Sequence, residues 1–299
     1  MKIVVIGEVL WDLFPGEERL GGAPFNFAVQ ASRLGHDVRF VSAVGADARG
    51  SLILNRAEHL GLDTQFLHVV AGRQTGVVSV HVDAEGKPAF HLHRPAAYDS
   101  VTMDDTALDR LRAWDPDWMY FGTLHQMQPE VRELTARMAD TLHRARKFYD
   151  INLRPHSYTL ELVESLMAIA DAVKWNDEEA REVDAMFNFH GRPLEEFTAH
   201  WQRQFGWQAV AVTRGPNGSS VRIGDEYAEG AGFAVTVADT VGAGDAFAAA
   251  FLHGLSQGWN AAKTGEFANR VGALVASRPG AIPEWSLEDC RKLAIATHE

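Results

Sequence analysis

The sequence predicts an α/β fold, in which a parallel sheet is covered by helices on both faces and carries a small β-sheet lid. Two observations support this prediction. Short, mostly β-branched segments alternate with segments of helical spacing along most of the 299 residues, as expected for βαβ units with right-handed crossovers. Over residues 76–93 the hydrophobic period changes to two around a turn at 83–88, which indicates an inserted β-hairpin.

The first strand is the clearest single element. Residues 2–6 are apolar after Lys2 and end at Gly7, as in a buried strand of a parallel sheet. Helical spacing over residues 26–34 ends at Gly35, a common residue type at the C-terminus of a helix. The same criteria predict, in order, a strand at 38–44, a helix at 51–60, the hairpin, a helix at 105–113, a strand at 118–121, a helix at 129–146 and a strand at 148–151.

The second half continues this alternation and ends in three helices. We find no repeats and no Pro- or Ser-rich linker, so one domain is expected. The predicted elements are a helix at 159–170, a strand at 172–175, a helix at 195–205, a strand at 209–213, short strands at 219–223 and 233–237, and helices at 245–255, 261–277 and 286–296.

The composition excludes several classes of protein. Forty acidic and 28 basic residues leave a net charge of −12, so no nucleic acid is expected as a partner. The single cysteine, Cys290, excludes an intrachain disulfide and a multi-cysteine metal site. The N-terminal apolar run is too short for a signal peptide, and no apolar stretch approaches the roughly 20 residues of a membrane span. A cytoplasmic location without a membrane partner is therefore expected.

A glycine-rich turn precedes the helix predicted at 245–255. Small residues at Gly242, Ala243 and Gly244 let successive backbone N–H groups converge at a helix N-terminus, where they bind anions. The turn is not a Walker A loop, because no Gly-Lys-Ser/Thr follows, and it is not a dinucleotide fingerprint, because Phe247 replaces the third glycine. A plain glycine turn before a capping acid is the structural alternative.

A second glycine turn lies at residues 21–26, Gly-Gly-Ala-Pro-Phe-Asn, again where a loop meets a helix. The paired glycines allow a ligand to approach the backbone closely. Asn26 offers both a donor and an acceptor to hydroxyl groups. The alternative is that Asn26 caps the helix.

These two turns resemble the two signature regions of the ribokinase-like (PfkB) carbohydrate kinase family, and the resemblance covers essentially the whole chain. It implies a ribokinase-like three-layer α/β/α sandwich with a mostly parallel central sheet and a small β-sheet lid. It also implies a single sugar kinase domain over residues 1–299, with lid strands inserted at roughly 10–25 and 76–95.

The resemblance implies ATP-dependent phosphorylation of a sugar hydroxyl. Asp245 would be the base that takes the proton from this hydroxyl, a contribution of about 10²–10⁴ in rate. The N–H groups of Gly242, Ala243 and Gly244 would form the anion hole for the transferred phosphoryl group.

Five residues are expected to bind the sugar. Asp12, which follows the first strand, would hold sugar hydroxyls, with Gly22 and Asn26 beside it. Arg94 lies in a segment that resembles the Arg-Pro-x-Ala-Ala region of fructokinase-like members. Arg154 lies in Asp-Ile-Asn-Leu-Arg-Pro, which resembles a segment of fructokinases and 2-keto-3-deoxygluconate kinases. It would neutralise a phosphate or a substrate carboxylate, unless it is a surface residue at the end of a strand.

The nucleotide side is expected on later loops and helices. Thr213, Gly215 and Gly218 resemble the turn near the ATP phosphates and ribose, and Asn269 lies on the helix that lines the adenine side in relatives. Asn176 is also expected close to the phosphates, because it begins the family's Asn-x-x-Glu motif.

The resemblance also implies metal ions. Asn176 and Glu179 would organise Mg²⁺ through its waters, since Mg²⁺ usually keeps several of them; the alternative is a helix start with acids in its first turn. Family members often use a monovalent cation, and the sequence allows a K⁺ site at Asp239 and the carbonyls of Val241 and Ala281.

The favoured reaction is the conversion of D-fructose to fructose 6-phosphate with MgATP, because the segment Gly7–Pro15 is most like bacterial fructokinases. Leu10 stands where ribokinase proper carries an Asn, which argues against ribose. The alternatives are 2-keto-3-deoxygluconate or another sugar or nucleoside as the substrate. A protein of the same fold that only senses a sugar or nucleotide is the non-enzyme alternative.

The lid hairpin carries an apolar stripe, Val78, Val80 and Val82. An exposed apolar β-face is unfavourable in a monomer. We therefore expect this face to be exposed on one chain and covered by a second copy, in a homodimer that pairs through the lid.

Overall fold

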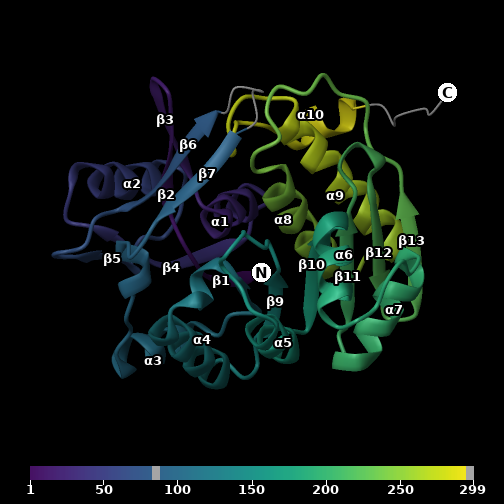
Figure 1. Ribbon diagram of the computed structural model, residues 1–299, viewed down its shortest axis with the longest axis horizontal. Coiled ribbons are helices and arrows are strands. Elements are labelled where there is room, and N and C mark those ends of the chain that lie inside the picture. Colours follow the sequence, from purple (N-terminus) through teal and green to yellow (C-terminus); the bar gives the residue numbers. More distant parts are fainter. Residues whose placement is uncertain (83–87, 294–299) are drawn as a thin grey trace.

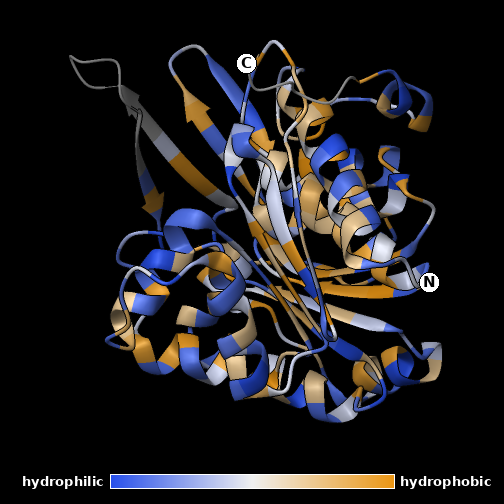
Figure 2. Cartoon of the chain, turned by 90° about the vertical axis from the view of Figure 1, so that its right-hand side faces the viewer, coloured by the Kyte–Doolittle hydropathy of each residue, from blue (hydrophilic) through white to orange (hydrophobic). Residues whose placement is uncertain are grey.

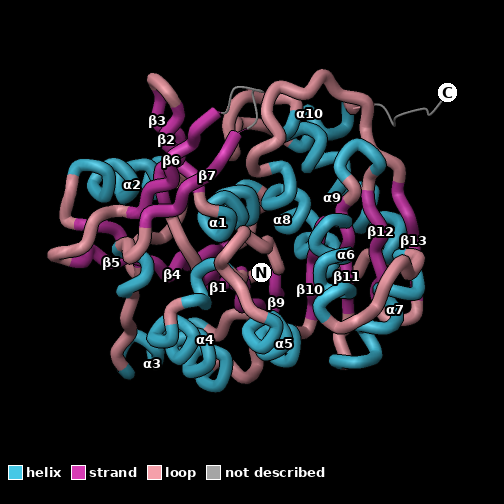
Figure 3. The backbone as a smooth tube through the Cα atoms, in the orientation of Figure 1, coloured by secondary structure: helices cyan, strands magenta, loops and turns pink. Residues whose placement is uncertain are grey.

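A nine-stranded sheet forms the centre of the computed structural model (Figures 1 and 3). The structure describes residues 1–82 and 88–293, and of residues 80–82 and 88–90 it describes the backbone only. The strands, in their order across the sheet, are β13 (Glu226–Gly230), β12 (Ser219–Ile223), β11 (Ala209–Thr213), β10 (Ala172–Asn176), β9 (Arg146–Asp150), β8 (Trp118–Gly122), β1 (Lys2–Ile6), β4 (Asp37–Gly45) and β5 (Leu67–Val70). Only the pairs made by β12 are antiparallel in this described sheet.

Helices cover both faces of this sheet. In β1, Ile3 and Val5 pack into one core and Val4 and Ile6 into the other, as the alternation of side chains along a strand requires. Figure 2 shows the apolar strands enclosed between the two helical layers. The first core is completed by α1 (Ala23–Arg33), α2 (Ala48–His59), α8 (Ala243–Ser256), α9 (Ala261–Ala276) and α10 (Leu287–Lys292), and the second by α3 (Asp105–Trp114), α4 (Pro129–Thr141), α5 (Leu160–Ile169), α6 (Asp177–Met186) and α7 (Leu194–Phe205). The predicted three-layer α/β/α architecture is thus confirmed.

A second, four-stranded sheet forms the predicted lid and stands at one side of the molecule in Figure 1. Its order is β3 (Glu17–Gly21), β2 (Leu10–Phe14), β6 (Gly76–Val82) and β7 (Pro88–His93). The central pair, β2 and β6, is parallel, and the two outer pairs are antiparallel. The lid therefore joins two segments that are far apart in the sequence.

One prediction about the lid is wrong. Val78 is buried, because it packs in a small apolar cluster with Leu10, Ala96 and Tyr98, where the chain returns beneath the lid after β7. The side chains of Val80 and Val82 lie outside the described residues. The homodimer stays a prediction, and Val78 does not support it.

Several element boundaries differ from the predictions. The strand predicted at 233–237 is wrong, because β12 turns back at Gly224 and pairs with residues 226–230 instead. The helix predicted from 129 to 146 ends at Thr141, since residues 146–150 pair with β8 in the sheet. No helix among the described residues is long and apolar enough to cross a membrane.

Candidate active site

Four polar or charged residues lie at the carboxyl ends of the parallel strands. Glu8 follows β1, Asp150 ends β9, Asn176 ends β10 and Thr213 ends β11. In open α/β sheets, ligands bind at this edge. The helices α1 and α8 pack side by side next to it (Figure 1), and each begins at one of the two glycine turns.

Asp245 lies in the first turn of α8 and is buried. Its Oδ2 accepts a hydrogen bond of 2.8 Å from Nδ2 of Asn26 on α1. Burial, reinforced by the negative charge of Asp150, raises the pKa of Asp245 from 3.8 to about 6. The Asn26 hydrogen bond and the cations Lys174 and Arg154 act in the opposite direction. The group is a carboxylate at neutral pH, with more affinity for a proton than an ordinary aspartate.

The turn before Asp245 requires a glycine at its first position. Gly242 has a φ of 79°, and a Cβ there would overlap the carbonyl of Ala281, so only glycine fits. The N–H of Ala243 donates to the carbonyl of Thr240 at 3.3 Å, which is a long bond. The turn leads directly into the N-terminus of α8, where free N–H groups and the helix dipole favour an anion.

A buried ion pair lies behind this turn. Nζ of Lys174 on β10 is 3.0 Å from Oδ1 of Asp150 on β9, and Tyr120 donates to the other carboxylate oxygen at 3.2 Å. The Lys174 and Asp150 side chains are 6% and 0% exposed. A Cβ at Gly244 would lie 3.3 Å from the ammonium, so Lys174 reaches the start of α8. The ammonium end of this pair therefore lies beside the glycine turn, with its counter-charge on Asp150.

A cluster of acids occupies the lid side of the site. Asp12, on β2, packs with its Oδ2 against Gly21, and burial raises its pKa from 3.8 to about 6. Glu8 is buried with an unpartnered Oε2, and burial raises its pKa to about 7. Arg154 is exposed, and its positive charge lowers the pKa of both acids. Arg154 is therefore the cation that lowers the pKa of both acids in this cluster.

Gly22 brings the second glycine turn against the loop after β1. It precedes α1 with a φ of 107°, and a Cβ there would lie 2.6 Å from the carbonyl oxygen of Glu8. Any other residue would push this loop away from α1 and from Asn26. The turn thus fixes the distance between the acid cluster and Asp245.

A model of the pfkB family of carbohydrate kinases matches residues 2–288. The chain belongs to this family. It is 29% identical to a sugar kinase of Pyrococcus horikoshii over 95% of this chain and 92% of that protein. The structure of the Pyrococcus kinase in complex with ATP superimposes with a TM-score of 0.81 over 94% of both chains. The chain is thus a carbohydrate kinase of the pfkB family.

Other relatives within the family act on different substrates. The chain is 28% identical to a fructokinase of Klebsiella pneumoniae over 85% of this chain and 84% of that protein. It is 26% identical to an aminoimidazole riboside kinase of Salmonella typhimurium over 99% of this chain and 96% of that protein. Because the chain is about equally identical to relatives of different specificity, these identities do not define its sugar substrate.

Two predicted site residues of this pfkB kinase form a helix cap. Oδ1 of Asn176 accepts the N–H groups of Glu178 and Glu179 at 2.9 and 2.8 Å, and Oε2 of Glu179 accepts the N–H of Asn176 at 2.8 Å. Oε1 of Glu179 accepts the N–H of Leu153 at 3.0 Å, which ties the Arg154 loop to α6. Asn176 and Glu179 therefore cap the start of α6, which is the alternative to a Mg²⁺ site given above. Each oxygen of the Glu179 carboxylate still keeps one lone pair that can accept a hydrogen bond from a water.

The predicted nucleotide residues lie together near the antiparallel edge of the kinase sheet. Oγ1 of Thr213 donates to the carbonyl of Trp175 at 3.4 Å, and Gly215 and Gly218 form the turn that follows β11. Asn269, on α9, donates to the carbonyl of Ala231 at 3.2 Å, so its amide already holds the loop after β13. Its contact with adenine stays a prediction.

Arg94 is bound within the kinase. Its guanidinium pairs with the Asp99 carboxylate at 2.5 and 3.2 Å and donates to the carbonyl of Leu124 at 3.2 Å. The side chains of Arg94 and Asp99 are 17% and 2% exposed. Contact of Arg94 with the sugar stays a prediction, and the arginine has little free capacity for a substrate carboxylate.

Two of the three predicted K⁺ ligands, Asp239 and Ala281, already accept hydrogen bonds. Oδ1 of Asp239 accepts the N–H of Val241 at 3.0 Å, and Oδ2 accepts the N–H of Gly280 at 3.2 Å and Nη1 of Arg19 at 2.9 Å. The carbonyl of Ala281 receives the Gln30 amide at 3.4 Å. A K⁺ ion needs oxygens that replace its hydration shell, and Arg19 already occupies one side of the Asp239 carboxylate. The K⁺ site stays a prediction.

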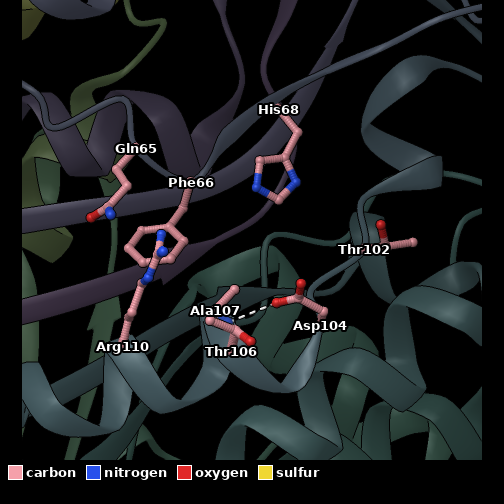
Figure 4. A pocket seen from close by; sticks show the side chains of 8 residues that line it. All are labelled: Gln65, Phe66, His68, Thr102, Asp104, Thr106, Ala107 and Arg110. Atoms are coloured by element: carbon pink, nitrogen blue, oxygen red, sulfur yellow. Dashed lines mark hydrogen bonds between the residues drawn. The ribbon is translucent and has the colours of Figure 1, made fainter.

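A cavity of about 340 Å³ lies elsewhere, between the start of β5 and the start of α3 (Figure 4). None of the predicted site residues lines it. Asp104 uses Oδ1 to cap α3 through the N–H of Ala107 at 2.7 Å, the bond drawn in Figure 4. The cavity is lined by Gln65, Phe66, His68, Thr102, Asp104, Thr106, Ala107 and Arg110. We assign it no part in the reaction.

Two charged residues of the kinase site, Lys174 and Glu8, were not predicted from the sequence. Lys174 follows an ordinary strand pattern, and only its place two residues before Asn176 on a buried strand could have singled it out. Glu8 was passed over although it follows β1 directly, the position that made Asp12 a candidate. A charged residue within or just after an otherwise apolar strand is the signal that applies to both.

Proposed function

We propose that this kinase, a single domain with a lid, transfers the γ-phosphoryl group of ATP to a hydroxyl of D-fructose. The observation that carries the proposal is the buried Asp245 at the N-terminus of α8, held by Asn26 at 2.8 Å directly after the Gly242–Gly244 turn. A base and an anion-binding turn at adjacent positions are what phosphoryl transfer to an alcohol requires.

In this proposal Asp245 takes the proton of the sugar hydroxyl as the hydroxyl oxygen bonds to the γ-phosphorus. The bond from that phosphorus to the bridging oxygen of ADP breaks, and ADP leaves. Asn26 keeps the Asp245 carboxylate in place through one oxygen and leaves the other for the hydroxyl. The N–H groups of the 242–244 turn and the nearby Lys174 charge stabilise the transferred group.

Magnesium carried by ATP would neutralise phosphate charge. Among the described residues, no group of three or more His, Cys, Asp or Glu is arranged to hold a metal ion directly. The capped Glu179 and Asn176 are suited to bind the waters of such an ion. Thr213, Gly215, Gly218 and Asn269 are proposed for the rest of the nucleotide.

The charge of the site favours a neutral sugar. Glu8, Asp12 and Asp245 all lie close enough to Arg154 for its charge to lower their pKa values, while Arg94 is committed to Asp99. A substrate carboxylate would meet this negative field with Arg154 as its main partner. The lid acid Asp12 is suited to accept sugar hydroxyls instead.

A 2-keto-3-deoxy sugar acid is the second candidate, and one observation favours it. Arg154 is exposed, and its recorded hydrogen bond is to the carbonyl of its own neighbour Leu153 at 3.2 Å. A guanidinium of this kind can bind a carboxylate bidentately. Arg154→Gln should therefore abolish activity on a sugar acid but reduce activity on fructose only moderately.

The test is an ADP-release assay over fructose, ribose, tagatose, 2-keto-3-deoxygluconate and adenosine. We expect fructose to give the highest kcat/KM, and Asp245→Asn to lower kcat by about 10²–10⁴ while ATP still binds. The matched control is Asp104→Asn, at the exposed cap of α3, which should leave the rate unchanged. Normal turnover by the Asp245 variant would show that the base is wrongly assigned. A protein inactive on all five compounds would rule out the proposed substrate.

A further inference from the structure

The carboxylate of Asp239 marks the start of the loop that leads to the anion-binding turn. It is 13% exposed. Two of its three donors are backbone N–H groups, from Val241 and Gly280, and the third is the guanidinium of Arg19. Neutral amides do not cancel the carboxylate charge, so Arg19 is the charged partner that does.

Arg19 comes from a distant part of the chain. It lies on the lid strand β3, 220 positions before Asp239. Its guanidinium also contacts Glu17 and lies over the Phe14 ring at 4.6 Å, which holds the side chain toward the loop. Both ends of this ion pair act on Asp12, since Arg19 lowers and Asp239 raises the pKa of that acid. The pair thus links the lid, the acid cluster and the glycine turn.

Among the described residues, the Asp239 and Ala281 oxygens of this loop already face hydrogen donors. The Ala281 carbonyl packs against Gly242 and receives Gln30, and the Asp239 oxygens face three donors. An unneutralised Asp239 would repel the phosphoryl group held a few residues further along the same loop. Some positive charge is needed at this place, and the structure provides it from a side chain.

We propose that Arg19, carried by the lid, takes the place of a monovalent cation behind the anion-binding turn, so that the enzyme needs no such ion. Arg19 is a positioning residue, because it acts on the turn through Asp239. The inference rests on the proposed function of the 242–244 turn. It also means that the turn reaches its full anion affinity only when β3 lies against the loop.

The experiment measures ADP release in potassium, sodium and tetramethylammonium chloride at constant ionic strength. The wild type should give the same rate in all three salts. Arg19→Ala should be about 10-fold slower in tetramethylammonium and recover in potassium, which can enter the space left by the guanidinium. Arg19→Lys keeps the charge and should keep the indifference to the salt.

Arg49→Ala is the matched control. Arg49 also pairs with an acid of β3, at 2.6 and 3.0 Å from the Glu18 carboxylate, and its recorded bonds do not include Asp239. This variant should remain indifferent to the salt. Activation of the wild type by potassium, or a full rate of Arg19→Ala in every salt, would overturn the inference.

A second readout does not depend on turnover. Thermal unfolding of the protein without substrates should give one midpoint for the wild type in potassium and in tetramethylammonium, whereas potassium should raise the midpoint of Arg19→Ala. If no sugar is phosphorylated, the proposed function fails, yet this measurement still decides the role of Arg19. A wild type stabilised by potassium over tetramethylammonium would refute it.

Discussion

Replacing Asp245 by asparagine should stabilise the fold while it stops catalysis. The carboxyl is buried, and burial together with the charge of Asp150 raises its pKa from 3.8 to about 6. A raised pKa means that the folded state holds the proton more tightly than the unfolded chain does. The ionised form that catalysis needs is therefore a cost to stability.

The size of this cost follows from the shift. A rise of roughly two pKa units corresponds to about 3 kcal/mol. For an acid whose folded pKa is raised, stability is retained below the unfolded value, near 3.8, and is lost as the pH rises through about 6. Asparagine carries no charge and can still accept the 2.8 Å hydrogen bond from Asn26. Asp245→Asn should thus gain up to about 3 kcal/mol at about pH 8 and about half of that near pH 5.

Urea unfolding of the wild type and of Asp245→Asn, across this range of pH, measures the difference. The contrasting control is Asp184→Asn, because Asp184 is buried in an ion pair with Arg192 and also accepts from Trp201 at 3.1 Å. That variant should lose stability at both ends of the range. The reasoning is refuted if Asp245→Asn is less stable than the wild type at about pH 8, or if its gain is the same at every pH.

Three further predictions concern the same site. The kcat/KM of the wild type should fall about tenfold per pH unit below about 6, as Asp245 takes up a proton, and a profile flat to pH 5 would contradict this. Gly242→Ala should lose both activity and at least about 2 kcal/mol of stability, because residue 242 has a positive φ and a Cβ there would overlap the Ala281 carbonyl. A stable, active variant in the same unfolding and ADP-release assays would disprove this tight fit. Lys174→Met should cost about 3–5 kcal/mol of stability in urea unfolding, because it leaves Asp150 buried without its cation. Adding Asp150→Asn should recover much of this loss. An equal loss in the double variant would mean that the ion pair is not the cause.

Much of the fold could be read from periodicity and glycine positions. Residues 2–6 and 209–213 form strands as predicted, because continuous apolar runs can be buried on both faces only inside a parallel sheet. The two glycine turns marked the starts of α1 and α8, since backbone conformations there depend on local residues. The failures, such as the strand predicted at 233–237, arise where the pairing partner in the sheet, and not the local pattern, decides the boundary.

The sequence by itself determined the layered fold, the family and the segment that contains Asp245, because each depends on short-range pattern. Only the tertiary structure decided which charges meet. It brings Asn26 to Asp245, Lys174 to Asp150 and Arg19 to Asp239 across as many as 220 positions. It also buries Val78 beneath the lid and commits Arg94 to Asp99. Electrostatic contacts depend on distance and burial in space, and neither is written in the order of the residues.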